Sequence, residues 1–369
     1  MILFLHNRYR RSGGEERAVE DLLWLVREHL GEDAELLERD SALLGRGSAA
    51  AGMLGGGLRP DEVARAVRRT GARVVHAHNL NPAFGWRSLA AAHGAGARVV
   101  AHLHQYRLVC AVGICFTDGH ECTRCHGRNT LPGVLRDCRG EPAEALVYAT
   151  AIALWQRRLA GLIDAAVVPS RFALARLGEL GAPLPAHTHV LAHPVRGFAA
   201  RSRAASGTYA LFSARLEPEK GLEVAIEACA IAGLPLVVAG AGSQRPLFDG
   251  TPGVSFAGEV SQAELADLRA GARVALMPSR TSETFGLAAA EAMAAGLPVA
   301  GSDIGALPEL IPRRWLSPAG DARTLAATIS GLAGEREAGD EALAVARELL
   351  DPARLAAALA AIYGSVSGG

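Results

Sequence analysis

Short apolar runs alternate with longer helical stretches along this chain, and the alternation occurs in two separate series. The runs are rich in Val, Ile and Leu, whereas the stretches between them are rich in Ala, Leu, Arg and Glu. This order is typical of β-α units and a parallel sheet, so we expect two doubly wound α/β halves. The predicted strands cover 1–5, 73–77, 97–102 and 164–168 in the first half, and 209–212, 236–239, 254–256, 274–277 and 298–300 in the second.

Length and charge narrow the class of protein further. At 369 residues the chain is too long for one ordinary core and suits two domains. Its 38 basic and 38 acidic side chains cancel, so we expect no nucleic-acid partner. The amino terminus has no basic leader, and no segment supplies about 18 uninterrupted apolar residues for a membrane span. We therefore expect a cytoplasmic protein whose six cysteines are thiols or metal ligands rather than disulfides.

A polar turn from Ser279 to Leu287 follows the strand predicted at 274–277 and leads into a helix. Open α/β sheets bind ligands at the carboxyl ends of their strands. The amides at the start of a helix are unpaired donors at the positive end of its dipole, so a phosphate or a sugar hydroxyl fits there. Glu283 and Glu291 frame this turn and would hold hydroxyl groups.

The spacing of Glu283, Phe285, Gly286 and Glu291 resembles the donor site of retaining glycosyltransferases of family 4. The resemblance implies a GT-B fold, with two Rossmann-like domains facing a central cleft. An acceptor domain is expected over 1–195 with a cysteine-rich insertion at 105–140, then a linker over 196–208. A donor domain would follow over 209–350, and a helix over 351–369 would cross back to the first domain.

The same resemblance assigns roles to charged residues of the second half. Arg215 and Lys220 would hold the donor's diphosphate and stabilise the charge that develops as the nucleoside diphosphate leaves. Glu291 would hold the ribose hydroxyls. The transferred sugar would contact Glu283 and the amides of Thr284, Phe285, Gly286 and Leu287. The alternative for Arg215 and Lys220 alone is an ordinary solvated helix start.

Two glycine pairs follow predicted strands. Ser12-Gly13-Gly14-Glu15 matches a capping box between Ser12 and Glu15, but capping does not explain the glycines. Close approach to a ligand does explain them, and the resemblance places Gly13 and Gly14 near the donor's phosphates; a tight turn is the alternative. Gly240 and Gly242 alone are weak evidence for a dinucleotide site. Family 4 enzymes have a similar turn that approaches the donor nucleotide, so the resemblance places Gly240 and Gly242 near that nucleotide.

His102 and His104 end the strand predicted at 97–102 and should lie on the same side of it. The family has a histidine near the anomeric region of the sugar, and His104 matches it as a residue that orients and polarises the sugar. A core histidine is the alternative. His6, His76 and His78 are interpreted as loop or hydrogen-bonded structural residues.

Five of the six cysteines lie between Cys110 and Cys138, and Cys122-Thr123-Arg124-Cys125 has the spacing of a zinc knuckle. The region resembles a cysteine-rich subgroup of the family, whose recurring positions match Cys110, Cys122, Cys125 and Cys138. A structural zinc, reduced thiols and a redox bridge all stay open. Because the insertion follows His104 closely, we expect it to help select the acceptor.

The sequence therefore predicts a retaining glycosyltransferase that uses a nucleotide diphosphate sugar, with a UDP-sugar favoured. No Asp-x-Asp motif is present, so we expect transfer without a catalytic metal. The alternatives are a silent sugar-nucleotide-binding or scaffold protein, and a GT-B-like sugar-nucleotide epimerase. Residues 141–162, with Trp155, form a core helix or a peripheral membrane contact, and we favour the core helix. The base, sugar, acceptor and oligomeric state are not specified.

Overall fold

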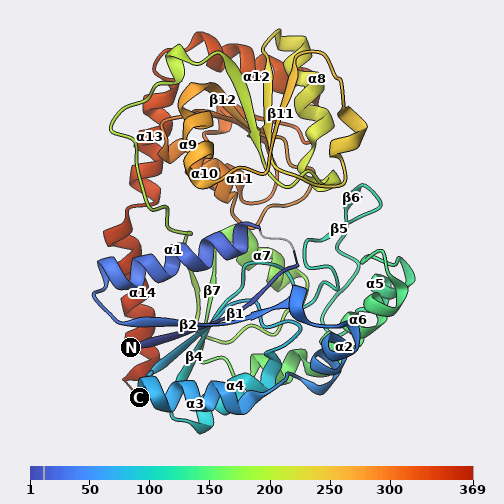
Figure 1. Ribbon diagram of the computed structural model, residues 1–369, viewed down its shortest axis with the longest axis vertical. Coiled ribbons are helices and arrows are strands. Elements are labelled where there is room, and N and C mark those ends of the chain that lie inside the picture. Colours follow the sequence, from blue (N-terminus) through green and yellow to red (C-terminus); the bar gives the residue numbers. More distant parts are fainter. Residues whose placement is uncertain (11–12, 369) are drawn as a thin grey trace. The chain divides into compact units, whose positions relative to one another are not determined.

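The computed structural model describes residues 1–10 and 13–368, and the chain divides into two compact units (Figure 1). The first unit contains Met1–Thr117, Cys122–Pro194 and the chain from Pro352 onward. The second contains Asp118–Glu121 and Val195–Asp351. Each unit has its own six-stranded parallel sheet, which confirms the prediction of two doubly wound α/β halves.

The sheet of the first unit has the order β2-β1-β3-β4-β7-β8. The four strands predicted for this half are present as β1, β3, β4 and β7. The two edge strands, β2 and β8, were not predicted. The bounds are β1 Ile2–Arg8, β2 Ala34–Asp40, β3 Val74–Ala77, β4 Arg98–His102, β7 Ala165–Val168 and β8 Thr188–Val190.

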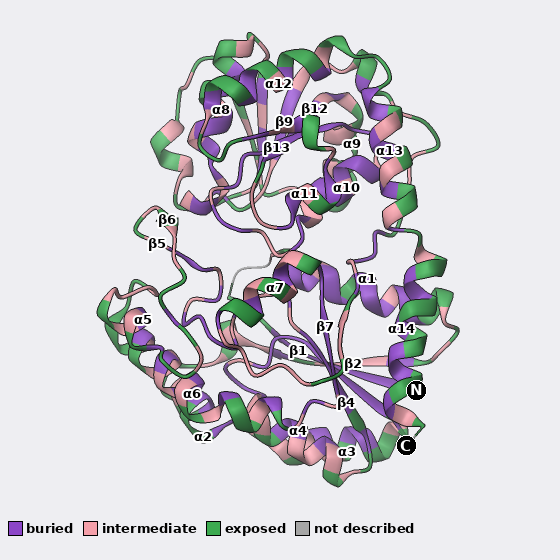
Figure 2. Cartoon of the chain, turned by 180° about the vertical axis from the view of Figure 1, so that it is seen from behind, coloured by how far each residue is buried: buried purple, intermediate pink, exposed green. Residues whose placement is uncertain are grey.

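Helices cover both faces of this sheet. Ile2 and Phe4 of β1 pack into a core with helices α1 and α14, whereas Leu3 and Leu5 pack into a second core with α3 and α4. Successive side chains of a strand point to opposite faces, so one apolar strand serves both cores. Figure 2 shows the buried residues on the strands and on the inner sides of the helices. The helices are α1 Gly14–His29, η1 Ser41–Leu43, α2 Arg46–Gly55, α3 Pro60–Thr70, α4 Gly85–Gly94, α7 Arg171–Glu179 and α14 Pro352–Ser367.

The segment after β4 contains the predicted insertion. Two short strands, β5 Phe116–Thr117 and β6 His120–Glu121, pair with each other and not with the main sheet. The short helix α5 Leu131–Leu135 and the long helix α6 Pro142–Ala160 follow.

The sheet of the second unit has the order β11-β10-β9-β12-β13-β14, which places β9 and β12 at its centre. All five predicted strands are present, and the two-residue edge strand β14 was not predicted. The strands are β9 Tyr209–Ser213, β10 Leu236–Ala239, β11 Val254–Gly258, β12 Ala272–Met277, β13 Val299–Ser302 and β14 Leu316–Ser317. The helices are η2 Ala204–Ser206, η3 Pro218–Lys220, α8 Leu222–Ala232, η4 Arg245–Phe248, α9 Gln262–Gly271, α10 Leu287–Ala294, α11 Leu307–Leu310, η5 Arg313–Trp315, α12 Ala322–Gly334 and α13 Ala338–Leu349.

One stretch, Ala338–Ser367, is long and apolar enough to cross a membrane when only length and composition are considered. The stretch is not an uninterrupted apolar run, because Asp351 and Arg354 lie within it, so the expectation of no uninterrupted apolar run of about 18 residues holds. The stretch includes two helices: α13 ends at Leu349, and α14 begins at Pro352. Apolar side chains of α14, among them Leu359, are buried in the first core of the first unit. Core packing therefore accounts for the apolar character of α14.

Candidate active site

The segments that follow β9 and β12 bring a lysine and a glutamate together in the second unit. These strands are neighbours and parallel, so their carboxyl ends lie at the same edge of the sheet. Lys220 ends η3 and donates from Nζ to Oε1 of Glu283 at 2.7 Å. Ser279 donates from Oγ to the same oxygen, also at 2.7 Å. The structure thus joins two predicted site residues that lie 63 positions apart in the sequence.

Glu283 is ionised in this arrangement. Burial raises its pKa, but the Lys220 charge and the hydrogen bonds from Lys220 and Ser279 outweigh burial and hold the pKa below its usual value. The side chains of Lys220 and Glu283 are only 17% and 13% exposed. The pair is therefore a largely desolvated ion pair, in which loss of one partner leaves an uncompensated charge.

Lys220 is the only lysine in the sequence, and the other 37 of the 38 basic side chains are arginines. Lysine presents a compact ammonium with three donors, whereas the planar guanidinium of arginine needs more room and a different geometry. The only lysine side chain of the chain therefore contacts Glu283, whereas all remaining basic positions have arginine.

Arg215 belongs to the same electrostatic cluster. Its Nη2 donates to Oε1 of Glu219 at 2.8 Å, and its side chain is 44% exposed. Its charge also lowers the pKa of Glu283. The three charged residues predicted at the carboxyl ends of β9 and β12 are thus close enough to act together, with Arg215 as the most exposed cation.

The helix after this turn begins later than the sequence indicated. α10 starts at Leu287, and Gly286 precedes it with φ of +98°, a value that favours glycine. Phe285 is buried. Glu291 of α10 accepts a hydrogen bond from Arg269 at 2.5 Å, and both side chains are about 10% exposed or less. Arg269 therefore fixes the carboxylate that was predicted to hold ribose, a partner that sequence reasoning missed.

The glycines after β10 have a structural reason. Gly240 has φ of +134°, and a Cβ there would lie 2.0 Å from the carbonyl oxygen of Ala214. A Cβ on Gly242 would lie 2.4 Å from the carbonyl oxygen of Leu216. The turn therefore packs directly against the backbone that follows β9. Its predicted contact with the donor nucleotide stays a prediction.

Replacement of Gly242 by alanine should destabilise the second unit by about 1–3 kcal/mol, because backbone atoms cannot move aside as a flexible side chain can. Chemical denaturation followed by circular dichroism measures the change. Gly331→Ala in α12 is the matched control, since a Cβ there meets no atom within 4 Å, and it should leave stability unchanged or raise it by up to about 1 kcal/mol. Equal stability of both variants would contradict the close packing of this turn.

The start of α1 differs from the predicted capping box. Ser12 lies outside the described residues. The amide of Gly13 donates to Oε2 of Glu16 at 2.8 Å, so Glu16 and not Glu15 closes the turn. Gly13 is extended, with φ of −153°, and Gly14 is the first residue of the helix. Any residue adopts the backbone of Gly13, so its conformation does not explain the glycine; the predicted phosphate contact stays a prediction.

Glu15 instead belongs to a polar network of the first unit that sequence reasoning missed. It accepts a hydrogen bond from the Tyr9 hydroxyl at 2.6 Å and one from Gln105 Nε2 at 3.3 Å. Gln105 in turn accepts from Arg107 Nε at 2.9 Å. Burial raises the pKa of Glu15, although nearby His6 and the Tyr9 hydrogen bond oppose the shift. Only the fold brings these residues together, since no motif links them.

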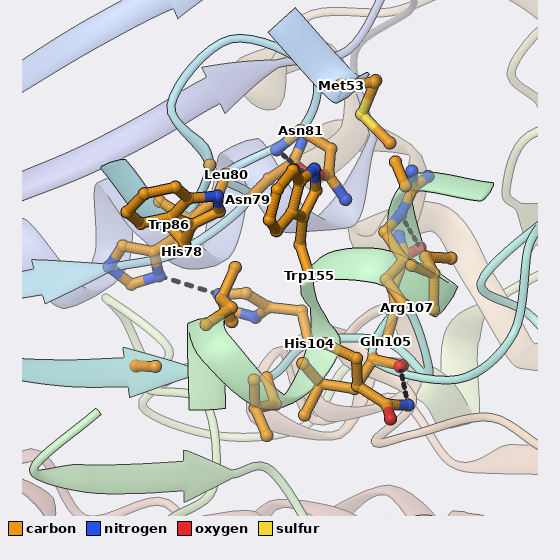
Figure 3. Close-up of a pocket in the computed structure, with 18 of the residues that line it drawn as sticks. Met53, His78, Asn79, Leu80, Asn81, Trp86, His104, Gln105, Arg107 and Trp155 are labelled. Atoms are coloured by element: carbon orange, nitrogen blue, oxygen red, sulfur yellow. Dashed lines mark hydrogen bonds between the residues drawn. The ribbon is translucent and has the colours of Figure 1, made fainter. Parts of the chain in front are cut away.

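This network lines a pocket whose other wall is apolar and aromatic (Figure 3). Trp86 and Trp155 contact each other with ring centroids 5.7 Å apart and ring planes inclined at 46°, and Met53 and Leu80 also line the wall. Trp155, on α6, donates from Nε1 to the carbonyl oxygen of Leu54. The aromatic end of α6 therefore forms part of a pocket.

His104 lies on the same pocket wall and contacts a histidine rather than solvent. Figure 3 shows it pointing toward His78, and His104 Nε2 and His78 Nδ1 are 2.8 Å apart. Its ring stacks on His102 at 4.3 Å, so the two lie on the same side, as predicted. Burial holds the pKa of His104 well below its usual value, so it is neutral at physiological pH. The role of His104 toward the sugar stays a prediction.

The five clustered cysteines line one small pocket of the insertion. All six cysteines of the chain are free thiols. A hydrogen bond from Cys115 lowers the pKa of Cys110 to about 6, whereas burial raises the pKa of Cys125 to about 11. Within the described ranges, no three cysteine sulfurs lie within 4.8 Å of one another. Cys110, Cys122, Cys125 and Cys138 thus form no preassembled zinc site, and zinc binding there stays a prediction.

Part of this chain is similar in sequence to known glycosyltransferases. Residues 207–335 match the family model described as glycosyl transferases group 1. Over 136 residues the chain is 37% identical to the amylovoran biosynthesis glycosyltransferase AmsK of Erwinia amylovora. That match covers 31% of this chain and 33% of the length of AmsK, so the chain spans about a third of this relative.

Solved structures match over nearly the whole chain. Sucrose-phosphate synthase from Thermosynechococcus elongatus has a TM-score of 0.70 at 18% identity, with 99% of this chain and 98% of that chain covered. Anabaena HepE, solved in complex with UDP-glucose, has a TM-score of 0.65 at 17% identity, with 99% of each chain covered. The protein therefore has the two-domain GT-B fold. Its second unit, which contains the Lys220–Glu283 pair, includes the segment 207–335 that is similar to glycosyl transferases group 1.

Proposed function

We propose that this chain is a retaining glycosyltransferase that moves a sugar from a nucleotide diphosphate sugar to an acceptor without a catalytic metal. The observation that carries the proposal is the desolvated Lys220–Glu283 pair at the carboxyl ends of β9 and β12. It lies within the segment that matches glycosyl transferases group 1. A UDP-sugar is the favoured donor, and the UDP-glucose complex of HepE supports this choice.

The charges of this cluster suit the departure of a diphosphate. As the glycosidic bond to the diphosphate breaks, negative charge accumulates on the leaving oxygen, and fixed cations stabilise it. Arg215, as the more exposed cation, and Lys220, as the less exposed one, would supply these charges. Glu283, ionised and held by Ser279 and Lys220, would accept hydrogen bonds from sugar hydroxyls.

The acceptor would bind in the pocket of the first unit. The Trp86 and Trp155 rings offer an apolar aromatic surface, and Glu15 with Gln105 offers hydrogen-bonding groups in the same pocket. Pockets that combine apolar walls with a few fixed polar groups are typical of small-molecule sites. We also propose a cytoplasmic location, where nucleotide sugars are available as donors.

Retention of configuration tests the mechanism separately from donor identity. With a donor of defined α configuration, proton NMR of the first sugar product should show an α-anomeric signal before mutarotation mixes the anomers. A β-anomeric first product would contradict retention. A chain that binds nucleotide but forms no sugar product with any donor would instead support a silent sugar-nucleotide-binding protein.

A further inference from the structure

Six of the twelve histidines of the sequence lie buried in the first unit and contact one another through their rings. His76 and His78 lie on or directly after β3, and His102 ends the neighbouring strand β4. The centroids of His76 and His78 are 4.5 Å apart, and those of His78 and His102 are 5.6 Å apart. The other members of the cluster are His6, His104 and His193.

Three members place a ring nitrogen within mutual reach. One nitrogen of each of His76, His78 and His102 lies within 4.8 Å of one nitrogen of the other two. His102 also belongs to a second such group with His104 and His193. The two groups thus share His102.

The first group has buried nitrogens that the protein does not satisfy. His76 Nε2, His78 Nε2 and both nitrogens of His102 are buried and have no hydrogen-bond partner among the described residues. Burying an unsatisfied polar atom costs about 1–3 kcal/mol. A neutral imidazole has one nitrogen lone pair, so these three adjacent rings point to a ligand that would accept one lone pair from each of them.

Hydrogen bonds already orient two of these rings. His76 Nδ1 lies 2.7 Å from the hydroxyl of Tyr363 on α14, and His78 Nδ1 lies 2.8 Å from Nε2 of His104. Histidines that bind metals are oriented in this way, with one nitrogen on the ion and the other hydrogen-bonded to a neighbour. The first group has this arrangement before any ion is bound.

We propose that His76, His78 and His102 bind one divalent transition-metal ion of the zinc and cobalt class through one ring nitrogen each. Neutral imidazole is a preferred ligand of such ions. Nitrogens around a tetrahedral zinc are ~3.4 Å apart, so ring nitrogens that lie at the 4.8 Å limit would need to approach by ~1.4 Å. His78 and His102 also line the pocket, which gives the ion an entry path and leaves a coordination position open toward it.

The proposed ion would tie elements of the first unit together. It would join β3 to β4 directly, and it would act on α14 through the contact between His76 and Tyr363. The nearest acidic contact of the cluster is Glu16, which lies 3.7 Å from His6, whose ring in turn contacts His78. This role is structural, lies in the first unit and does not depend on the proposed glycosyl transfer.

Cobalt titration of the full chain, after removal of metals with EDTA and of EDTA by gel filtration, tests the site. Cobalt absorbs visibly when bound in tetrahedral sites, and thiolate ligation adds a charge-transfer band in the near ultraviolet. We expect one equivalent bound with visible bands and without the thiolate band, together with a higher melting temperature. His76→Gln and His102→Gln should each weaken binding at least tenfold.

His187→Gln is the matched control, because His187 is exposed and lies outside the cluster. It should bind cobalt as the unmodified chain does. The titration of the unmodified chain is decisive even where a cluster variant fails to fold. Absence of a visible cobalt spectrum, a spectrum with thiolate ligation only, or unchanged binding in folded His76→Gln and His102→Gln would overturn the proposal.

Discussion

Lys220→Arg should lower the turnover of a donor sugar by ~10²–10³-fold while leaving the fold intact. This range is typical for removal of one group that stabilises charge in a transition state. Arginine keeps the positive charge near Glu283, so the largely desolvated carboxylate is not left unpaired. Its larger planar head cannot reproduce the contact at 2.7 Å between Nζ and Oε1 in the same space. The expected loss therefore reports geometry at the leaving group rather than net charge.

Steady-state turnover and thermal melting measure the two effects side by side. Arg314→Gln is the control within the same unit, because Arg314 pairs with Glu341 on the surface and is 53% exposed. It should change neither turnover nor melting temperature measurably. Since Lys220 is also the only ε-amine of the chain, nucleotide should protect that amine from acylation, as read by peptide mass spectrometry. Full turnover by folded Lys220→Arg would contradict the assigned role.

Acidification from pH 7 to pH 5 should remove about 4 kcal/mol of stability through His76 and His193 alone. Burial lowers the pKa of His76 to about 3 and that of His193 to about 4, whereas an unfolded histidine titrates near 6.5. Between these values the unfolded chain binds protons that the folded chain does not. Stability is therefore fully present above about pH 6.5 and falls as the pH decreases, by about 2 kcal/mol per histidine at pH 5.

The choice of pH separates the contribution of the histidines to stability from the contributions of other titratable groups near the cluster. Tyr363 has a raised pKa and does not titrate in this range, and Glu16 has a lowered pKa, so its contribution is lost below about pH 4.5. The pKa of Cys110 is lowered to about 6, so its contribution to the unfolding free energy also decreases as the pH falls from 7 to 5. The Cys110→Ser variant removes this contribution and leaves that of the histidines. Urea unfolding with EDTA at pH 7, 6 and 5 measures the change. An unfolding free energy that stays constant from pH 7 to pH 5 would contradict neutral buried histidines.

Central strands were predictable, but edge strands were not. Strands buried on both faces are continuous apolar runs, and the sequence contains these plainly. β2, Ala34–Asp40, lies at an edge and carries Glu and Arg side chains, so its pattern does not indicate a buried strand. β8 and β14 have only three and two residues, too few for any periodicity to appear.

For the site, residues that follow a strand were predictable, and their partners across the fold were not. Lys220 and Glu283 each lie in the segment that follows an apolar strand, and parallel neighbouring strands bring such segments together. The contact of Arg269 with Glu291 depends on how two helices pack, which spacing along the chain does not encode. The histidine cluster likewise requires β3 and β4 to be adjacent, so separate motifs gave no indication of it.

Nucleotide release from UDP-, GDP-, ADP- and dTDP-sugars, measured with EDTA present, tests the central claim most directly. We expect slow hydrolysis of one donor, most readily a UDP-sugar, and its loss by ~10²-fold or more in Lys220→Arg. That result would establish a metal-independent transferase centred on the Lys220–Glu283 pair and identify its donor. No release from any donor, together with no donor-induced rise in melting temperature, would contradict the proposed function.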